Sequence, residues 1–309
     1  MPRMGFLSGT LFLSLSVGRE FGIGFGLFVY SKCKILYFVL QLVNHGIPVE
    51  LLERVKKVSS EFYKMEREEN FNKSKVVELL DERGVTLEDA DWEDVVTLLD
   101  DNEWPSKTPG FQEIMKDYRF ELKKLAEKVM QVMDENLGLP NGYIKTAFND
   151  GDGDNAFFGT KVSHYPPCPH PEKVKGLRAH TDAGGVILLF QDDKVGGLQV
   201  LKDGKWIDVQ PLPNAIVINT GDQIEVLSNG RYKSAWHRVL RSVDGNRRPI
   251  ASFYNPSLKA TIAPAPQLVE KTKQVGETYP KFVFGDYMSV YVQQQFLPKE
   301  PRFQAVRAM

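Results

Sequence analysis

A series of short apolar runs, each bounded by turn residues, constrains the fold of this chain most strongly and lies between residues 157 and 256. Runs of this length are typical of β-strands, and many in succession favour two packed antiparallel sheets. Asp203-Gly204 separates two of the runs and predicts a tight hairpin turn. The region therefore predicts a jelly roll that closes over a site. The runs cover residues 198–201, 206–209, 215–219, 224–227 and 250–254.

Helical periodicity precedes and follows this region. Residues 49–71 and 112–137 carry apolar side chains three and four positions apart, with charged residues between them. This is the pattern of an amphipathic helix that packs on a core. Gly138 is a typical residue just beyond a helix end. Residues 279–292 predict another helix, which would cover the mouth of the barrel. The expected fold class is mainly β with flanking helices (α+β).

His180, Asp182 and His237 are residue types that together hold ferrous iron. In an extended strand, residues i and i+2 point to the same side, so His180 and Asp182 can bind one ion together. The apolar segment 186–190 predicts a buried strand after them, and a distant strand over 233–240 would bring in His237. Two histidines and one carboxylate occupy one face of the ion, which leaves the other face open to substrate and O2.

The charge and the cysteine content narrow the class of protein further. The net charge is -1 and the pI is near 6.6, so nothing indicates nucleic acid as a partner. Cys33 and Cys168 make no disulfide framework, which favours a reducing, cytoplasmic location. No uninterrupted apolar run has the length of a membrane span, so no membrane association is expected. The sequence does not fix the oligomeric state.

Long blocks of sequence around the three residues carry a resemblance. They include Phe158-Gly159-Thr160-Lys161, Tyr165-Pro166-Pro167-Cys168-Pro169, Asn219-Thr220-Gly221-Asp222-Gln223 and Lys299-Glu300-Pro301-Arg302-Phe303. From about Leu42 to the C-terminus the chain resembles the plant 1-aminocyclopropane-1-carboxylate (ACC) oxidases, a family within the Fe(II)/2-oxoglutarate-dependent dioxygenase superfamily. Related oxoglutarate dioxygenases share the triad but not, as a rule, the first and last of these blocks.

The resemblance implies both a fold and a reaction. The core would be a distorted double-stranded β-helix over residues 153–257, with an N-terminal helical region over 41–152 and a C-terminal helical tail over 258–309. The histidine and aspartate triad would bind Fe(II). ACC and O2 would be the substrates, ascorbate the cosubstrate, and bicarbonate or CO2 an activator. The products would be ethylene, cyanide and CO2.

Further residues match family positions near the site. The resemblance implies catalytic roles for Lys161, Arg178 and Arg302, the last of which lies in the block that resembles the activation region. Arg247 matches the arginine of an Arg-x-Ser motif that grips a carboxylate of oxoglutarate in related enzymes; in the oxidases it would serve a carboxylate, bicarbonate or ascorbate. Positions that would bind cofactors or line the pocket are Tyr165, Asn219 and Gln191, with Thr160 and Phe253.

Pro249 is a departure from the family pattern. Arg247-Arg248-Pro249 stands where Arg-x-Ser is expected, so the hydroxyl is absent and a predicted strand loses one backbone donor. Two alternatives to an ACC oxidase follow. One is a 2-oxoglutarate-dependent hydroxylase, against which the missing serine argues. The other is a catalytically impaired family member, owing to Pro249 and the altered N-terminus.

Residues 1–40 form an atypical apolar leader that does not match the family. Three explanations compete: a misjoined or alternative first exon, a secretory signal, and a membrane span. Arg3 precedes an apolar run over residues 6–17, but no Ala-x-Ala-like cleavage site follows it.

Three histidines outside the triad have simpler expectations. His45 belongs to an Asn-His-Gly turn and is expected to be structural, whereas His164 and His170 are expected to face solvent.

Overall fold

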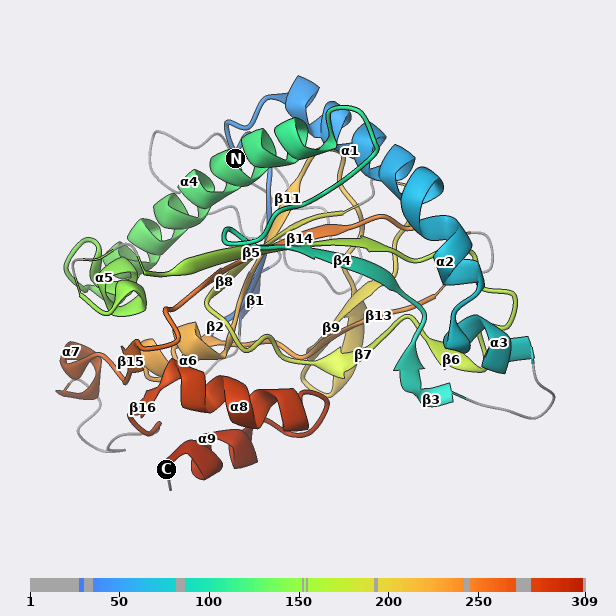
Figure 1. The fold of residues 1–309 in the computed structure, drawn as a ribbon. Helices are drawn as coiled ribbons and strands as arrows, with labels where there is room; N and C mark the ends of the chain where they lie inside the picture. Colours follow the sequence, from blue (N-terminus) through green and yellow to red (C-terminus); the bar gives the residue numbers. More distant parts are fainter. Residues whose placement is uncertain are drawn as a thin grey trace, which may run out of the picture.

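The chain folds into layers of helix and sheet, shown in Figure 1 as a computed structural model that describes residues 28–30, 36–81, 87–151, 153, 155–191, 194–241, 245–270 and 279–307. Helices α1 and α4 cover the outer face of a larger sheet, a smaller sheet faces its other side, and α8 and α9 lie together along one end. This arrangement is the α+β fold with a jelly-roll core that the strand pattern predicts.

The two main sheets account for most of the strands among the described residues. Their pairs are antiparallel, except that β12 pairs in parallel with β2. The larger sheet has the order β1 (Phe28–Tyr30), β2 (Leu36–Leu42), β11 (Ile216–Thr220), β8 (Val186–Phe190), β14 (Ile250–Asn255), β5 (Phe157–His164) and β4 (Asp94–Leu98), with β12 (Tyr232–Lys233) beside β2. The smaller sheet has the order β10 (Lys205–Asp208), β9 (Leu198–Lys202), β13 (His237–Val239) and β7 (Leu177–His180).

Two pairs of short strands lie outside these sheets. They are β15 (Thr261–Ile262) with β16 (Phe282–Val283), and β3 (Leu87–Asp91) with β6 (Val174–Lys175). The strands β3 and β4 lie in the part of the chain where the sequence predicts only helices, and β4 extends the larger sheet beyond β5.

The larger sheet is buried on both faces at its centre. All five residues of β11 are buried, because alternate side chains of a strand point to opposite faces and both faces are covered here. Ile216 and Ile218 join the core under the helices, whereas Val217 and Asn219 face the space between the sheets. A continuous run of buried residues therefore marks the strand that separates the helical core from the site.

The hairpin between β9 and β10 follows the sequence signal. Asp203 and Gly204 both have positive φ angles, 46° and 75°, as a two-residue turn between twisted strands requires. Lys202 and Lys205 are directly paired, so the turn has no additional residues.

Two strand predictions in this region need correction. Residues 224–227 belong to a helix, α6 (Asp222–Leu227), rather than to a strand. Every residue of α6 is buried, so no exposed polar face reveals its helical period. A short apolar run of this kind does not distinguish a buried helical turn from a strand. The predicted strand over 233–240 is interrupted, and only β12 and β13 at its two ends pair with other strands.

Helix α4 is the main support of the larger sheet. It runs over Phe111–Leu137 with a buried stripe at helical spacing that includes Met115, Tyr118 and Leu122. It ends at Gly138, which has a left-handed φ of 69° and donates its N–H to the last turn, as the glycine predicts. The other helices before the core are α1 (Val49–Phe62), the π-helical turn η1 (Tyr63–Arg67), α2 (Glu68–Asn72), α3 (Lys75–Asp81) and α5 (Tyr143–Asn149).

The C-terminal helices close the open end of the barrel. The helix predicted over residues 279–292 is α8, which begins later, at Phe284, and ends at Gln294. Its residues Met288 and Tyr291 line the space between the sheets, so α8 covers the barrel as expected. The remaining helices are α7 (Pro266–Glu270) and α9 (Glu300–Arg307).

The prediction for His164 is wrong. Its side chain is buried, its ring centroid lies 3.5 Å from that of Tyr63, and its Nε2 faces Asn246 Oδ1. Burial lowers the pKa of His164 to about 4. His164 is the last residue of β5, whose register turns it inward, while His170 stays partly exposed beyond the strand.

His45 has the structural role that its turn predicts. Its Nε2 donates to the Asn214 carbonyl at 2.8 Å, and its Nδ1 accepts the Ile47 N–H at 3.2 Å.

Part of the atypical leader belongs to the larger sheet. Of residues 1–40, the structure describes 28–30 and 36–40, which lie in β1 and β2. Strand β2 pairs with β11 from Val39 to Leu42. Among the described residues, no helix combines the length and the apolar content needed to cross a lipid bilayer.

Gly185→Ala tests the close approach of α5 to the start of β8. A Cβ at this position would lie 2.1 Å from the Phe148 ring and 2.6 Å from the Tyr254 carbonyl oxygen. Since overpacking a tight core costs about 1–3 kcal/mol, we expect the free energy of unfolding, measured by chemical denaturation, to fall by about 2 kcal/mol. Gly196→Ala is the control, because its Cβ would meet only Pro211 at 3.8 Å. Equal stability of the two variants would contradict the packing.

Candidate metal centre

Three side chains from two distant parts of the chain converge at one edge of the smaller sheet. His180 ends β7 and His237 begins β13, and the antiparallel register places the two residues opposite each other. Nε2 of His180 lies 3.8 Å from Oδ1 of Asp182, and Nε2 of His237 lies 3.6 Å from Oδ2 of Asp182. One ligand atom from each residue lies within 4.8 Å of the others. The structure therefore brings together the triad that the sequence predicts.

The local geometry differs from the expected strand pair in one respect. Asp182 lies beyond the end of β7, in the turn that leads to β8, and not two residues along a continuous strand. Strand pairing between His180 and His237 fixes the two imidazoles, and the turn then carries the carboxylate between them.

Hydrogen bonds aim both imidazole rings at the site. Nδ1 of His180 donates to the Arg178 carbonyl at 2.8 Å, and Nδ1 of His237 donates to the Ala235 carbonyl at 3.1 Å. Because a carbonyl can only accept, each ring keeps its Nε2 lone pair free for a metal ion. Burial, and to a smaller extent the neighbouring His237 ring, lowers the pKa of His180 to about 3, so that this ring is neutral.

The donor set fits iron(II). Two neutral imidazoles and one carboxylate on one side of an ion, with the remaining positions open, are typical of non-haem iron oxygenases. The remaining side of the triad faces a cavity of about 420 Å³ between the two sheets. The apolar part of the cavity wall includes Leu177, Ile187, Val200, Val217, Val239 and Phe253.

Backbone and amide contacts hold Asp182 in place. Asn219 Nδ2 donates to its Oδ2 at 3.0 Å, and the backbone N–H of Asp222 donates to its carbonyl at 2.8 Å. The neighbouring N–H of Gly221 donates to the Gly185 carbonyl at 2.7 Å. A Cβ on Gly221 would lie 2.3 Å from the Gly184 oxygen, so only glycine lets α6 approach the turn this closely.

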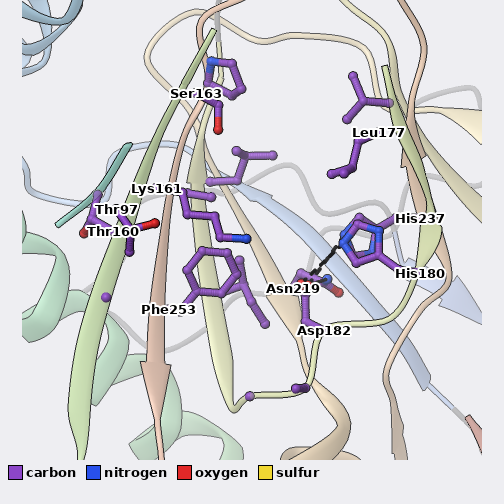
Figure 2. Close-up of a pocket in the computed structure, with 18 of the residues that line it drawn as sticks. Thr97, Thr160, Lys161, Ser163, Leu177, His180, Asp182, Asn219, His237 and Phe253 are labelled. Atoms are coloured by element: carbon purple, nitrogen blue, oxygen red, sulfur yellow. Dashed lines mark hydrogen bonds and ion pairs between the residues drawn. The ribbon is translucent and has the colours of Figure 1, made fainter. Parts of the chain in front are cut away.

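A lysine of the cavity wall extends toward the triad. Figure 2 shows Lys161 extending from β5 into the cavity toward the side that carries His180 and Asp182. Its Nζ lies 5.6 Å from the centroid of the Phe253 ring. Thr160, the preceding residue, contributes to the wall but has its hydroxyl bonded to Ser252. Lys161 can therefore meet a negatively charged group on a molecule in the cavity.

A second charged group lies elsewhere in the cavity. Tyr165 and Arg247 exchange backbone hydrogen bonds, and the Arg247 guanidinium carbon lies 5.3 Å from the Tyr165 ring centroid. The Tyr165 hydroxyl donates to Glu93 Oε1 at 2.7 Å. Burial raises the pKa of Glu93, although hydrogen bonds from Ser163 and Tyr165 partly offset this shift. This part of the cavity, the distal charge cluster, thus contains both an arginine and a carboxylate.

Pro249 lines the cavity without disturbing the sheet. Its carbonyl accepts the Ser163 N–H at 3.1 Å, in register with the backbone pair of Tyr165 and Arg247. Proline lacks the N–H that would complete the reciprocal bond, so the exchange with Ser163 is one-sided. The departure from Arg-x-Ser removes a hydroxyl from the cavity while β14 still begins at Ile250.

Three other sequence candidates are absent from the cavity wall. Arg178 pairs with Asp91, with Nε–Oδ1 and Nη2–Oδ2 distances of 3.2 and 3.3 Å, and its guanidinium lies 3.8 Å from the Phe296 ring centroid. Gln191 is buried just beyond the end of β8, and Arg302 is a completely buried residue of α9. The roles that the sequence resemblance implies for these three residues stay predictions.

Sequence reasoning gave no role to Glu93, Asp91 or Asp222. The first two flank Trp92, whose indole N–H donates to the Pro166 carbonyl at 2.9 Å. Trp92 is only 3% exposed, and of the two carboxylates beside it Glu93 lines the cavity whereas Asp91 pairs with Arg178. The partners of all three lie far away in sequence, so no local sequence pattern identifies them.

Comparison with known proteins supports this description of the site. The family model of the 2OG-Fe(II) oxygenase superfamily matches residues 157–256, which include the triad. A 1-aminocyclopropane-1-carboxylate oxidase from Musa acuminata is 70% identical over 275 residues, covering 87% of this chain and 89% of the relative. 1-Aminocyclopropane-1-carboxylate oxidase 5 from Arabidopsis thaliana is 69% identical over 279 residues, with the same coverage of 87% and 89%.

A solved structure shares the fold as well. A crystal structure described as JOX2 in complex with 2OG, Fe and JA has a TM-score of 0.74 and 35% identity, covering 89% of this chain and 82% of that one.

Asn219→Ala tests how the carboxylate is oriented. Without the Asn219 amide, Asp182 loses the hydrogen bond that fixes its Oδ2, and loss of such a partner weakens metal binding by about 10–100-fold. We expect this loss in an anaerobic calorimetric titration with Fe(II). Asn255→Ala is the matched control, because Asn255 also lines the cavity but bonds to the Gly185 N–H. An unchanged Fe(II) affinity in Asn219→Ala would contradict this role.

Proposed function

Because the chain belongs to the 1-aminocyclopropane-1-carboxylate oxidase family, we propose that it is an iron-dependent oxidoreductase that converts ACC to ethylene at the site formed by His180, Asp182 and His237. The observation that carries this proposal is the convergence of the three side chains, two imidazoles and a carboxylate, on the wall of a cavity between the two sheets. Cyanide and CO2 are the other products expected from the substrate.

The triad would hold Fe(II) through Nε2 of both histidines and the Asp182 carboxylate. When bound, iron(II) supplies the redox chemistry that lets O2 oxidise an organic substrate. The contribution of the chain is to fix the ligands through Arg178, Ala235 and Asn219, and to keep the other side of the site accessible from the cavity.

The cavity suits a small zwitterionic amino acid. Its apolar wall, with residues such as Ile187 and Val217, can pack against a hydrocarbon ring. Lys161 offers a positive charge to the substrate carboxylate from the opposite wall. With the ring against the apolar wall, the amine and the carboxylate would point toward the triad, because Lys161 extends toward that side of the cavity. We infer that Lys161 sets the orientation of ACC.

Ascorbate is the proposed cosubstrate and bicarbonate or CO2 the proposed activator. The reaction balances when ACC and ascorbate each give up two electrons and O2 is reduced to water. A singly charged anion such as ascorbate or bicarbonate needs one cation, and the described wall of the cavity offers Lys161 and Arg247. A reducing cytoplasmic setting would keep both the iron and ascorbate in their active forms.

The distal charge cluster argues against 2-oxoglutarate as the cosubstrate. A dicarboxylate that reached Arg247 would bring a negative charge close to Glu93, which the Tyr165 hydroxyl already contacts. Like charges at short range in a poorly solvated cavity repel strongly. Pro249 also removes the hydroxyl that Arg-x-Ser would offer. The cavity therefore favours a monoanion over a dianion.

Headspace gas analysis tests the activity directly. Protein reconstituted anaerobically with Fe(II), then supplied with ACC, O2, ascorbate and bicarbonate, should release ethylene, and omission of Fe(II) should abolish the signal. In the His237→Ala variant the rate of ethylene release should fall by at least about 1,000-fold, because one metal ligand is lost. Absence of ethylene from folded, iron-loaded protein, together with succinate formation from oxoglutarate, would reject the oxidase in favour of a hydroxylase.

Glu93→Gln tests the discrimination against dicarboxylates. We expect 2-oxoglutarate, used as an inhibitor of ethylene formation, to bind roughly 10-fold more tightly to this variant, since removing one like charge is worth about 1.4 kcal/mol. Glu103→Gln provides the same charge change at an exposed position outside the cavity wall, and its inhibition constant should match that of the parent. Equal inhibition of all three proteins would show that Glu93 does not exclude oxoglutarate.

A further inference from the structure

Thr181 lies between two of the proposed iron ligands, and its side chain is fully buried. Its Oγ1 accepts a hydrogen bond from Arg302 Nη2 at 2.8 Å and donates one to Asp222 Oδ2 at 3.3 Å. Its carbonyl accepts the Tyr291 hydroxyl at 2.8 Å. Thr181 is not part of the cavity wall. The two contacts of the Thr181 hydroxyl therefore support the ligand-bearing turn through residues that are not part of the cavity wall, Arg302 and Asp222.

Arg302 and Asp222 form an ion pair from which water is excluded. Both residues are 0% exposed, and Nη1 of Arg302 lies 3.4 Å from Oδ2 of Asp222. The Tyr287 hydroxyl donates to the same carboxylate oxygen at 2.6 Å. Because desolvation offsets the attraction, such a pair is a poor source of net stability. It does constrain geometry, since neither buried charge tolerates the loss of its partner.

The backbone of Asp222 extends this constraint to the metal ligand. Its N–H donates to the Asp182 carbonyl at 2.8 Å, while its side chain pairs with Arg302. One residue of α6 thus connects α9 to the turn in two ways, through Thr181 Oγ1 and through the main chain of Asp182.

A second buried ion pair joins the same two helical segments. Lys299, immediately before α9, donates to Glu225 Oε2 at 2.6 Å and to the Ser234 carbonyl at 2.8 Å. The Ser234 N–H donates to the same glutamate oxygen at 2.8 Å. The two carboxylates are three residues apart on α6, and the two cations have the same separation, so the pairs form in register. Ser234 precedes His237, so the second pair supports the segment that carries the third ligand.

We propose that Arg302, held by Asp222, is a positioning residue that orients the His180-Thr181-Asp182 turn for metal binding. The proposal rests on the iron site proposed above. Arg302 is completely buried and is not part of the cavity wall. An anion from solution would have to displace Asp222 to reach its guanidinium. Arg302 therefore acts through the turn and does not contact substrate or an activating anion.

Arg302→Met and Thr181→Val test the proposal by metal affinity and by spectroscopy. Arg302→Met removes the charge, whereas Thr181→Val removes only the hydroxyl and leaves Arg302 paired with Asp222. We expect Arg302→Met to weaken anaerobic Fe(II) binding by about 10-fold or more and Thr181→Val by several-fold, as for other partners of metal ligands. Both variants should alter the visible absorption spectrum of bound Co(II), which reports ligand geometry. Arg302→Lys should recover part of the affinity.

Val306→Ala is the matched control, because Val306 is a buried α9 residue, 3% exposed, that packs in the apolar core. It should lower the midpoint of thermal unfolding while Fe(II) affinity and the Co(II) spectrum stay those of the parent. The proposal is overturned if Thr181→Val binds Fe(II) as the parent does, or if Val306→Ala loses affinity to the same extent as Arg302→Met. Because Thr181→Val keeps the ion pair, it decides the question even if Arg302→Met does not fold.

These readouts separate the proposal from the proposed function. A parent protein that binds Fe(II) and releases no ethylene would reject the oxidase activity, while the variant series would still decide the role of Arg302.

Discussion

The turn between β7 and β8 depends on the N-terminus of α6 for its shape. N–H groups of Gly221 and Asp222, at the start of α6, donate to carbonyls of Gly185 and Asp182 within the turn. The free N–H groups at the start of a helix are suited to this, because they have no partners within the helix itself. Since β8 belongs to the larger sheet and β7 to the smaller one, this contact joins the two sheets and at the same time fixes the carboxylate of the triad.

Charge is separated across the cavity in a way that matches a small substrate. Lys161 extends toward the triad, whereas Arg247 lies beside Tyr165, whose hydroxyl contacts Glu93. A cation near the metal ligands attracts a carboxylate to that position. The Glu93 carboxylate elsewhere in the cavity wall disfavours a second carboxylate beside it. The JOX2 structure, which shares this fold, is a complex with 2OG. The difference in cosubstrate that we propose therefore resides in a few side chains of the wall and not in the architecture.

Sequence patterns predicted the elements that depend on local periodicity and missed those that depend on distant packing. The triad could be identified from its residue types together with the long blocks of sequence that surround them. Gly138 could be identified as a helix end because such ends often need a residue with a left-handed conformation. The buried state of His164 could not be predicted, since only its register in β5 turns it inward. Arg302 was expected near the site, yet its partner Asp222 lies far away in sequence, so their pairing appears only in the fold. Glu93 was missed for the same reason, because its partner Tyr165 is 72 residues away.

Strand β2 shows how a segment that departs from the expected family pattern can still support the site. Strands pair through backbone hydrogen bonds, which do not depend on side-chain identity. The side chains of β2 therefore need only suit the two faces of the sheet to which they alternately point. Val39 meets the core between the sheets, whereas Leu42 meets the core under the helices. Val39 is also paired with Asn219, whose amide holds Asp182. Only strand β11 therefore lies between β2 and the proposed iron ligand Asp182. A change that displaced Val39 would act on the metal site through β11, although no residue of β2 belongs to the triad.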